Sequence, residues 1–303
     1  MNTHFVTFPL TPAQAFAFAS ASCPEFTSTD PSLRSNQYSP ADLRSIVNTA
    51  ADLGIRIIPE LDVPGHAAGF RFGNPGYIAS CPAYIARYKH WGIPLNPAHP
   101  QLMSVVARLI HELSAIFPDK YLHLGGDEVS RPCWLEDPAF KTWVQSQEGK
   151  TIPHGDGINI NMQWRDDVTT DASALLMLEF FKIARENRKS VIVYQEVFDH
   201  QRINSNEHSV SQIWISKFAL TEHVNRGVAA ISSWGWYLNH GAEQCNSAHE
   251  CYSIDHLRDI ESFQKMSEEG RKRIMGGEMA LWEVAASQVQ VCVQAINKIA
   301  RVT

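Results

Sequence analysis

Two kinds of apolar pattern alternate along the chain. In residues 101–117 the apolar side chains recur every three or four positions, which is the spacing of one face of a helix. Runs such as 55–58, 121–124 and 191–194 are short and apolar, which indicates buried strands. The helical face in 101–117 consists of Leu102, Val105, Val106, Leu109, Ile110, Leu113 and Ile116.

The same alternation extends over the rest of the chain. Strands are predicted at 55–58, 121–124, 191–194, a run ending at Ile213-Trp214, 228–232 and 274–282, with a weaker candidate at 4–10. Helices are predicted at 40–53, 101–117, 172–187, 217–226 and 253–269, with one more closing the chain. This order is typical of parallel βαβ units and predicts an α/β fold, a TIM (β/α)8 barrel in a single domain, 1–303, that lacks one or two strands.

Composition narrows the class of protein. The chain has 303 residues, 44% of them hydrophobic and 19% charged, and a formal net charge of −6 without long runs of one sign. A nucleic-acid or anionic-membrane partner is therefore not expected. No apolar run is long enough for a membrane span, and the N-terminal residues do not resemble a signal peptide. The six cysteines form no CxxC pair, so we expect neither a structural metal nor a cofactor.

Polar residues follow the predicted strand 55–58. Glu60 and Asp62 share one face, because side chains alternate along a strand, and the turn at Pro64-Gly65 brings His66 to the same end. In a parallel barrel the working residues gather at the carboxyl ends of the strands. These residues are candidates for a site, although a carboxylate in the barrel core and a capping histidine would give the same pattern.

The segment His123-Leu-Gly-Gly-Asp-Glu128 follows the next strand. Asp127 and Glu128 reach one pocket only if the strand has ended before them, and the glycine pair favours such a bend. Two close carboxylates can differ in pKa, so that one is protonated and the other ionised. The pattern predicts acid/base chemistry, with a divalent-metal site or a helix cap as the alternatives.

Aromatic residues stand near several other strand ends. They are Tyr194, Trp214, Trp234, Trp236, Tyr237 and Trp282, and Glu196 lies among them. Several aromatic side chains at different strand ends suggest a wall for a sugar ring, because the C–H faces of a sugar suit aromatic surfaces.

Five motifs together resemble glycoside hydrolase family 20, most closely the lysosomal-type β-hexosaminidase subunits, over residues 11–283. They are Gly54-Ile-Arg-Ile-Ile-Pro-Glu-Leu-Asp-Val-Pro-Gly-His66, Tyr121-Leu-His-Leu-Gly-Gly-Asp-Glu-Val129, Gln195-Glu-Val-Phe-Asp199, Trp236-Tyr-Leu-Asn239 and Gly276-Gly-Glu-Met-Ala-Leu-Trp282. The resemblance implies a β-N-acetylhexosaminidase that acts on glycans with terminal N-acetylhexosamine and retains configuration with the help of the substrate's own 2-acetamido group, an exception to the two-carboxylate scheme.

The resemblance also implies a role for each matching residue. Glu128 would be the general acid and base, Asp127 would orient the acetamido group, and Tyr237 would bind its oxygen. The sugar-binding residues would be Tyr194, Trp214, Trp282, Asn239 and Glu283. Asp62, His66 and His123 would lie behind the carboxylates, and Cys81 and Cys133 would form a disulfide.

Some positions depart from the family pattern. No counterpart of the family's first strand, which carries a sugar-binding arginine, precedes Met1, and Pro9 and Pro12 replace a histidine and an aspartate of the second. We therefore expect an N-terminally truncated member whose barrel lacks its first strand and has a disrupted second strand. The resemblance further implies a lysosomal or secreted protein and a possible homodimer. A sugar-binding paralogue without activity, or an inactive fragment, remain the alternatives.

Overall fold

The computed structural model describes residues 4–10, 16–27, 37–147, 151–153, 159–161, 168–199, 203, 208–234, 237 and 264–280. The chain divides into two compact units, 1–209 and 210–303. None of the helices among these residues is both long and apolar enough to cross a bilayer.

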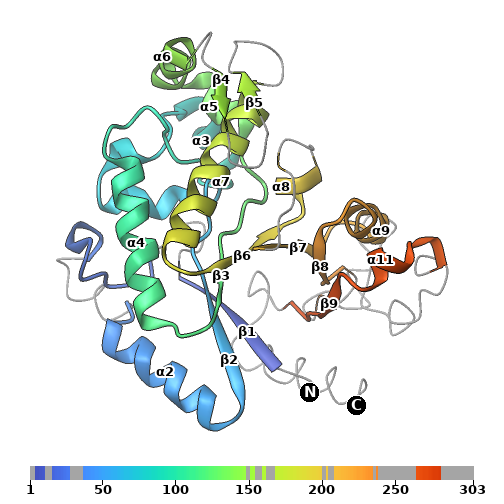
Figure 1. Cartoon of the computed structure of the whole chain (residues 1–303). Helices are drawn as coiled ribbons and strands as arrows, with labels where there is room; N and C mark the ends of the chain where they lie inside the picture. Colours follow the sequence, from blue (N-terminus) through green and yellow to red (C-terminus); the bar gives the residue numbers. More distant parts are fainter. Residues whose placement is uncertain are drawn as a thin grey trace. The chain divides into compact units, whose positions relative to one another are not determined.

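The first unit is built on four parallel strands in the order β1-β2-β3-β6 (Figure 1). The strands are β1 (His4–Pro9), β2 (Ile55–Glu60), β3 (Tyr121–His123) and β6 (Ser190–Tyr194). The helices are η1 (Pro24–Phe26), α2 (Pro40–Asp52), η2 (Ala67–Phe72), η3 (Pro75–Tyr77), α3 (Pro82–Tyr88), α4 (Leu102–Ile116), α5 (Arg131–Glu136), α6 (Pro138–Gln147), α7 (Val168–Glu186) and α8 (Glu196–Asp199). A separate antiparallel pair is formed by β4 (Thr151–Pro153) and β5 (Asn159–Asn161).

The second unit repeats the alternation with three parallel strands in the order β7-β8-β9. Its elements are β7 (Ser209–Ile213), which begins at the boundary between the units, α9 (Lys217–Asn225), β8 (Ala229–Ser232), α11 (Glu268–Arg271) and β9 (Ile274–Gly277). The described residues thus hold seven parallel strands joined by helices, which confirms the prediction of an incomplete α/β barrel.

The predicted elements agree with the structure except at some boundaries. α7 begins at Val168, four residues before the predicted start, and β9 ends at Gly277 instead of reaching 282. The weak candidate at 4–10 is the strand β1. Most of the predicted helix 253–269 and the whole closing helix lie outside the described residues.

β1 is a regular strand in spite of Pro9. It pairs with β2 in parallel from His4 to Pro9, and the N–H of Leu10 still donates to the carbonyl of Glu60 (3.0 Å). Pro9 is the last residue of the strand, so its missing N–H affects only the end of the ladder. The disruption expected from the prolines is therefore absent from His4–Pro9, and Pro12 lies outside the described residues.

Helix α2 begins with a capping box. The N–H of Asp42 donates to the hydroxyl of Ser39 (3.2 Å), and the N–H of Ser39 donates to the carboxylate of Asp42 (2.8 Å). The buried face of α2 packs on β2, and Leu53 and Gly54 lead directly into that strand. Gly54 has φ +72, which suits a glycine at the end of a helix.

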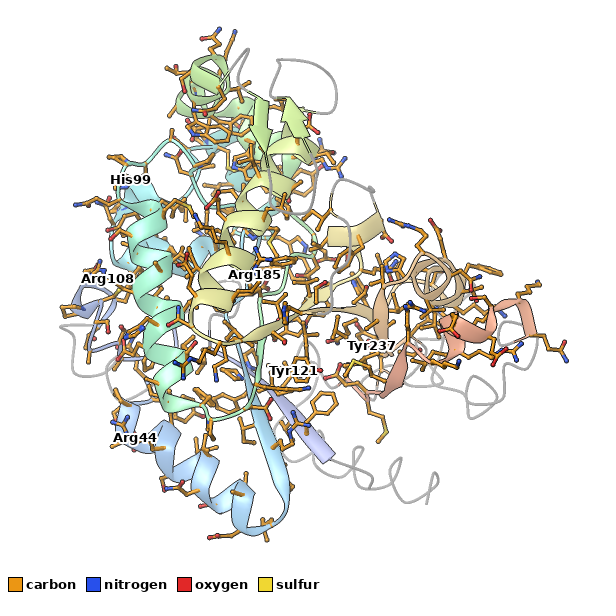
Figure 2. All side chains as sticks on the ribbon, in the orientation of Figure 1. Arg44, His99, Arg108, Tyr121, Arg185 and Tyr237 are labelled. Carbon is orange, nitrogen blue, oxygen red and sulfur yellow. A yellow bond between two sulfur atoms is a disulfide. The ribbon has the colours of Figure 1, made fainter. Side chains whose placement is uncertain are left out.

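Helix α4 lies beside α7 and buries all seven residues of its predicted apolar face (Figure 1). It also buries Glu112, whose carboxylate accepts hydrogen bonds from the hydroxyl of Ser20 (2.5 Å) and from the N–H groups of Ala21 (2.8 Å) and Ser22 (3.0 Å). Arg108 extends from the same helix (Figure 2) and pairs with Glu25 (2.9 Å). These contacts hold the segment after β1 against α4.

The amino ends of β2 and β3 are joined by a two-bonded ion pair. Nε and Nη2 of Arg56 donate to the carboxylate of Asp119 at 2.6 and 2.9 Å. The same carboxylate accepts from the N–H of Tyr121 (2.9 Å) at the start of β3. This pairing fixes the start of β3 relative to β2, at the end of the strands opposite to the predicted site.

Candidate active site

The backbone turns sharply after β3. The strand ends at His123, and left-handed φ angles follow at Gly125 (64°), Gly126 (98°) and Glu128 (46°). Glycine is required at position 125, because a Cβ atom there would overlap the carboxylate of Asp62. The strand therefore ends before Asp127 and Glu128, as predicted, and both carboxylates belong to an irregular loop.

The loop after β2 runs alongside this turn. The N–H of Leu61 donates to the carbonyl of His123 (2.9 Å), and the N–H of Val63 donates to that of Leu124 (3.2 Å). The chain then turns at His66, which has φ 46° and directly precedes the short helix η2. This path brings Asp62 and His66 next to Asp127.

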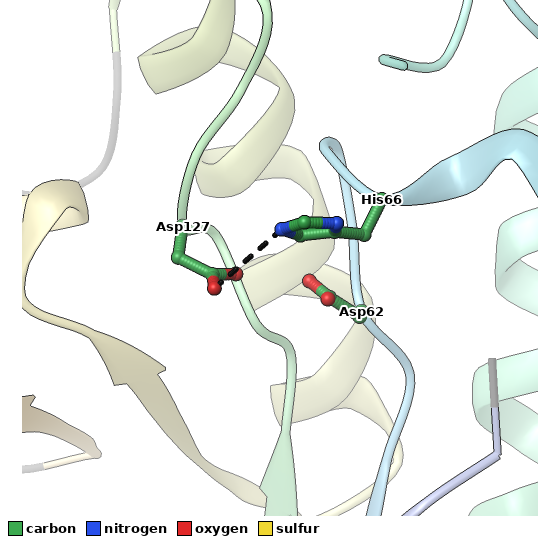
Figure 3. A group of neighbouring side chains, drawn as sticks. All are labelled: Asp62, His66 and Asp127. Atoms are coloured by element: carbon green, nitrogen blue, oxygen red, sulfur yellow. Dashed lines mark ion pairs between the residues drawn. The ribbon is translucent and has the colours of Figure 1, made fainter. Parts of the chain in front are cut away.

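Asp62, His66 and Asp127 point toward one another (Figure 3). Nε2 of His66 lies 3.3 Å from a carboxylate oxygen of Glu128 and 3.7 Å from one of Asp127. The exposed fractions are 8% for the His66 side chain, 13% for Asp127 and 34% for Glu128. One imidazole therefore reaches both carboxylates, of which Glu128 is open to solvent and Asp127 is largely enclosed.

The surroundings raise the pKa of both aspartates. Burial and the negative charges of Asp127 and Glu60 raise the pKa of Asp62 well above its usual range. Burial also raises the pKa of Asp127, and the charge of His66 acts in the opposite direction. Asp62 and Asp127 can share a hydrogen bond only when one of them holds a proton. The raised pKa of Asp62 favours Asp62 as the protonated partner.

The pKa of His66 is the balance of two opposing causes. Burial lowers it, because the imidazolium loses its hydration. The hydrogen bond to Glu128 and the charges of Asp127, Glu128 and Glu60 outweigh that loss and raise the pKa above its ordinary value. His66 therefore carries a positive charge over a wider pH range than a free histidine.

A fully buried layer lies below this cluster. Nδ1 of His123 is 3.3 Å from a carboxylate oxygen of Glu60, and it accepts the N–H of Gly125 (3.1 Å). The ring of Tyr194 meets the ring of His123 edge to face, with centroids 4.7 Å apart. His123 thus supports the turn, and Tyr194, only 4% exposed, lies against it at the end of β6.

Cys81 and Cys133 form the predicted disulfide. It joins the residue before α3 to the first turn of α5, 52 positions further along the chain. Cys23 is buried and carries a free thiol, and burial raises its pKa to about 11. Cys245, Cys251 and Cys292 lie outside the described residues.

Two features beside Glu128 were missed by the sequence analysis. A cavity of about 170 Å³ opens next to it and is lined by the start of α7 and the start of α8, including Thr169, Ser173 and Glu196. The exposed ring of Trp91 lies against the ring of His66. The polar residues at the start of α7 could have indicated the cavity. They lie more than 40 positions from Asp127 in the sequence, so the sequence alone does not connect them with it.

Three of the predicted aromatic residues lie among the described residues of the second unit: Trp214, Trp234, which is 6% exposed, and Tyr237. The rings of Trp214 and Tyr237 have centroids 6.5 Å apart, and Tyr237 forms a parallel bridge with Ala280. Trp282, Asn239 and Glu283 lie outside the described residues, so their predicted roles stay predictions.

Three side chains of the cluster could also ligate a cation. Asp62, His66 and Asp127 each offer one ligand atom, and these atoms lie within 4.8 Å of one another. Carboxylate and imidazole groups are ordinary ligands of divalent metals. The expectation that the protein uses no metal therefore stays a prediction.

The amino-acid sequence has clear relatives. It is 29% identical to the β-hexosaminidase subunit A1 of Dictyostelium discoideum over 279 residues, which are 88% of this chain and 47% of that protein. It is 27% identical to the β-hexosaminidase subunit beta of Mus musculus over 275 residues, 89% of this chain and 46% of that protein. The chain thus spans about half the length of these relatives.

The fold has relatives among solved structures. An exo-β-N-acetylglucosaminidase from Vibrio harveyi in complex with N-acetylglucosamine superposes with a TM-score of 0.75 at 18% identity, over 99% of this chain and 48% of that one. The β-N-acetylhexosaminidase from Bacteroides fragilis gives a TM-score of 0.72 at 17% identity, over 99% and 59%. Residues 3–297, nearly the whole chain, match the family described as glycosyl hydrolase family 20, catalytic domain. The chain belongs to glycosyl hydrolase family 20.

Proposed function

We propose that this chain is a β-N-acetylhexosaminidase that removes terminal β-linked GlcNAc or GalNAc from glycans. The observation that carries the proposal is the position of His66, whose Nε2 lies within 4 Å of both Asp127 and Glu128. A partly exposed carboxyl beside an enclosed one, with one imidazole between them, suits two carboxylates with different tasks. Membership of the family supports the same assignment.

Glu128 carries the proton transfers in this proposal. As the bond from C1 to the glycosidic oxygen breaks, the protonated Glu128 gives its proton to that oxygen. The carbonyl oxygen of the substrate's 2-acetamido group attacks C1 and forms a cyclic oxazolinium ion. Water then opens this ring at C1 and gives a proton to the Glu128 carboxylate, so that configuration is retained and the enzyme is regenerated.

Asp127 orients the acetamido group and stabilises the positive charge that develops on its nitrogen. It must be ionised for that task, and its burial opposes ionisation. The imidazolium of His66 lowers the pKa of Asp127 and so favours the carboxylate. Asp62, His66 and His123 thereby act through Asp127 and Glu128 and do not touch the substrate.

The remaining predicted residues bind the sugar. Tyr237 donates a hydrogen bond to the acetamido oxygen, and Tyr194, Trp214 and Trp282 surround the acetamido methyl and the ring. Asn239 and Glu283 bind the sugar hydroxyls. These roles follow the family resemblance, residue by residue.

The setting of the protein completes the proposal. We propose one catalytic domain over 1–303, acting without a cofactor, with a homodimer as its assembly. A disulfide between Cys81 and Cys133 suits an oxidising compartment, which supports a lysosomal or secreted location.

The direct experiment compares the purified wild-type chain with Glu128→Gln on an aryl β-N-acetylglucosaminide. Loss of the proton donor is expected to lower kcat by at least about 100-fold. Glu186→Gln, on the exposed last turn of α7, is the matched control and should keep full activity. Binding of GlcNAc by a folded wild-type chain without any turnover would overturn the enzyme assignment and favour a sugar-binding protein.

A second experiment tests the role of the acetamido group. Substrates whose N-acetyl group carries one, two or three fluorines have a progressively less nucleophilic carbonyl oxygen. The proposal predicts that kcat falls steeply along this series. A rate independent of fluorination would instead assign the attack on C1 to an enzyme carboxylate.

A further inference from the structure

Trp91 presents a large aromatic surface beside the catalytic cluster. Its side chain is 50% exposed, although aromatic residues of this size are usually mostly buried. Its ring meets the ring of His66 edge to face, with centroids 5.3 Å apart and planes at 89°. Among the described residues Nδ1 of His66 has no hydrogen-bond partner.

The loop that carries Trp91 is held against the catalytic loop. The N–H of Ser130 donates to the carbonyl of Gly92 (2.9 Å), and a Cβ atom on Gly92 would come within 2.5 Å of the Glu128 carbonyl. The hydroxyl of Tyr84 on α3 donates to the carbonyl of Trp91 itself (3.1 Å). The indole is therefore positioned by backbone contacts that include the proposed proton donor.

We propose that the indole of Trp91 stacks against the sugar ring on the leaving-group side of the scissile bond. The proposal rests on the proposed function, in which Glu128 protonates the glycosidic oxygen. That oxygen must come within hydrogen-bond distance of Glu128, so the departing sugar begins there. An aromatic face suits the C–H face of a sugar, and Trp91 is an exposed aromatic residue in contact with a neighbour of Glu128.

The cavity beside Glu128 is the competing place for the same sugar. Its volume is about 170 Å³, and it is lined in part by hydroxyl groups such as those of Thr169 and Ser173. None of the described residues that line it is aromatic, so it offers no flat apolar surface on which a sugar ring could stack. Trp91 lies on the open surface, where a longer glycan can continue beyond the first ring.

The test compares two substrates that differ only on the leaving-group side. One is the β-1,4-linked disaccharide of GlcNAc, and the other is β-N-acetylglucosaminyl fluoride, which has no leaving-group ring. Trp91→Ala is expected to lower the ratio of kcat/KM for the disaccharide to kcat/KM for the fluoride roughly three- to tenfold, and Trp91→Phe is expected to retain most of it. Leu53→Ala removes another exposed apolar side chain, at the amino end of β2, and should leave the ratio unchanged.

An equal loss on both substrates overturns the proposal, because it would mean that Trp91 only positions His66. A change of the ratio in Ser173→Phe, which fills the cavity, with none in Trp91→Ala overturns it as well and assigns the sugar to the cavity.

A binding experiment keeps the inference testable if the wild-type chain hydrolyses neither substrate, in which case the proposed function fails on its own. The probes are GlcNAc and the sulfur-linked disaccharide, which resists hydrolysis. Weaker binding of the disaccharide alone by Trp91→Ala, again roughly three- to tenfold, supports stacking on Trp91. Equal affinities of wild type and variant, or no binding of either probe to the wild type, contradict it.

Discussion

Nε2 of His66 lies 3.3 Å from a carboxylate oxygen of Glu128, and both residues have left-handed backbone conformations with φ 46°. Each of the two loops bends at the residue that makes this contact. Such conformations are uncommon for residues other than glycine and persist where the surrounding structure holds them. The charge on the imidazole therefore acts on carboxylates whose positions are fixed by the backbone.

His66→Asn tests this electrostatic coupling. The imidazolium lowers the pKa of Asp127, so its removal lets that pKa rise. If Asp127 must be ionised, the acid limb of the kcat/KM profile moves to higher pH in the variant. The measurement is kcat/KM from about pH 4 to pH 8, around the ordinary histidine pKa. His111→Asn, an exposed histidine on α4, is the control, and identical acid limbs for wild type and His66→Asn would contradict the coupling.

Asp62→Asn is expected to stabilise the fold at neutral pH while it impairs activity. The pKa of Asp62 is raised in the folded chain, so the folded state binds the proton more tightly than the unfolded state does. Stability from that proton is present at acid pH and is lost as the pH rises above the unfolded value of about 3.9. Asparagine imitates the protonated side chain without this loss.

Thermal unfolding of wild type and Asp62→Asn measures the difference. If Asp62→Asn raises the free energy of unfolding by about 1 kcal/mol near pH 7.5, its Tm should lie roughly 2–4 °C above that of the wild type. The difference in Tm should become smaller toward pH 4. An advantage of the variant that grows as the pH falls has the wrong sign and would reject a raised pKa for Asp62.

Gly125→Ala should lower stability and activity much more than Gly54→Ala, although both positions have left-handed backbone conformations. A methyl group at position 125 overlaps the Asp62 carboxylate, whereas one at Gly54, with a similar φ of +72, meets nothing within 4 Å. Gly54→Ala is expected to cost about 1–2 kcal/mol from the left-handed conformation alone. Gly125→Ala is expected to cost more and to abolish turnover. Denaturant unfolding and an aryl-glycoside assay report the two effects, and equal costs at the two positions would show that the contact with Asp62 is unimportant.

Removal of the disulfide should lower stability more than removal of the free thiol. Cys81→Ala with Cys133→Ala releases a loop spanning 52 positions, and the expected loss is about 2–4 kcal/mol of unfolding free energy. Cys23→Ala is the control for loss of a buried sulfur atom. A thiol reductant should lower the Tm of the wild type and of Cys23→Ala, which keep the disulfide, and should leave the Tm of the double variant unchanged. A wild-type Tm that does not respond to reduction would contradict the prediction.

The sequence predicted the elements of the fold and the ends of the strands well, because both depend on local pattern. The period of α4 placed its seven apolar residues correctly, and the glycine pair at 125–126 located the turn. The cluster of Asp62, His66 and Asp127 also followed, since the carboxyl ends of neighbouring parallel strands meet at one edge.

Contacts between segments distant in sequence were not predictable in the same way. Glu112 is a charged residue that is buried in α4, where its carboxylate accepts hydrogen bonds from Ser20 and from the two N–H groups after it. The periodicity of the helix gives no sign of partners that lie so far away in the sequence. Trp91 lies in the loop after helix α3. Because it does not follow a strand, a search for site residues at strand ends does not find it. Its relation to His66 arises from the path of the loop, which is held through Ile93 and Ser130.

The ion pair of Arg56 and Asp119 has a consequence for how the gene can vary. It anchors β2 and β3 at one end, and Asp62 lies six positions beyond Arg56. Because side chains on a strand alternate with a period of two, a single inserted codon between Arg56 and Glu60 would turn Glu60 and Asp62 to the other face while the anchor stayed in place. An insertion of two codons would restore the face but move both carboxylates past the turn at Gly125. The length of this stretch of β2 must therefore stay fixed if Glu60 and Asp62 are to reach the site.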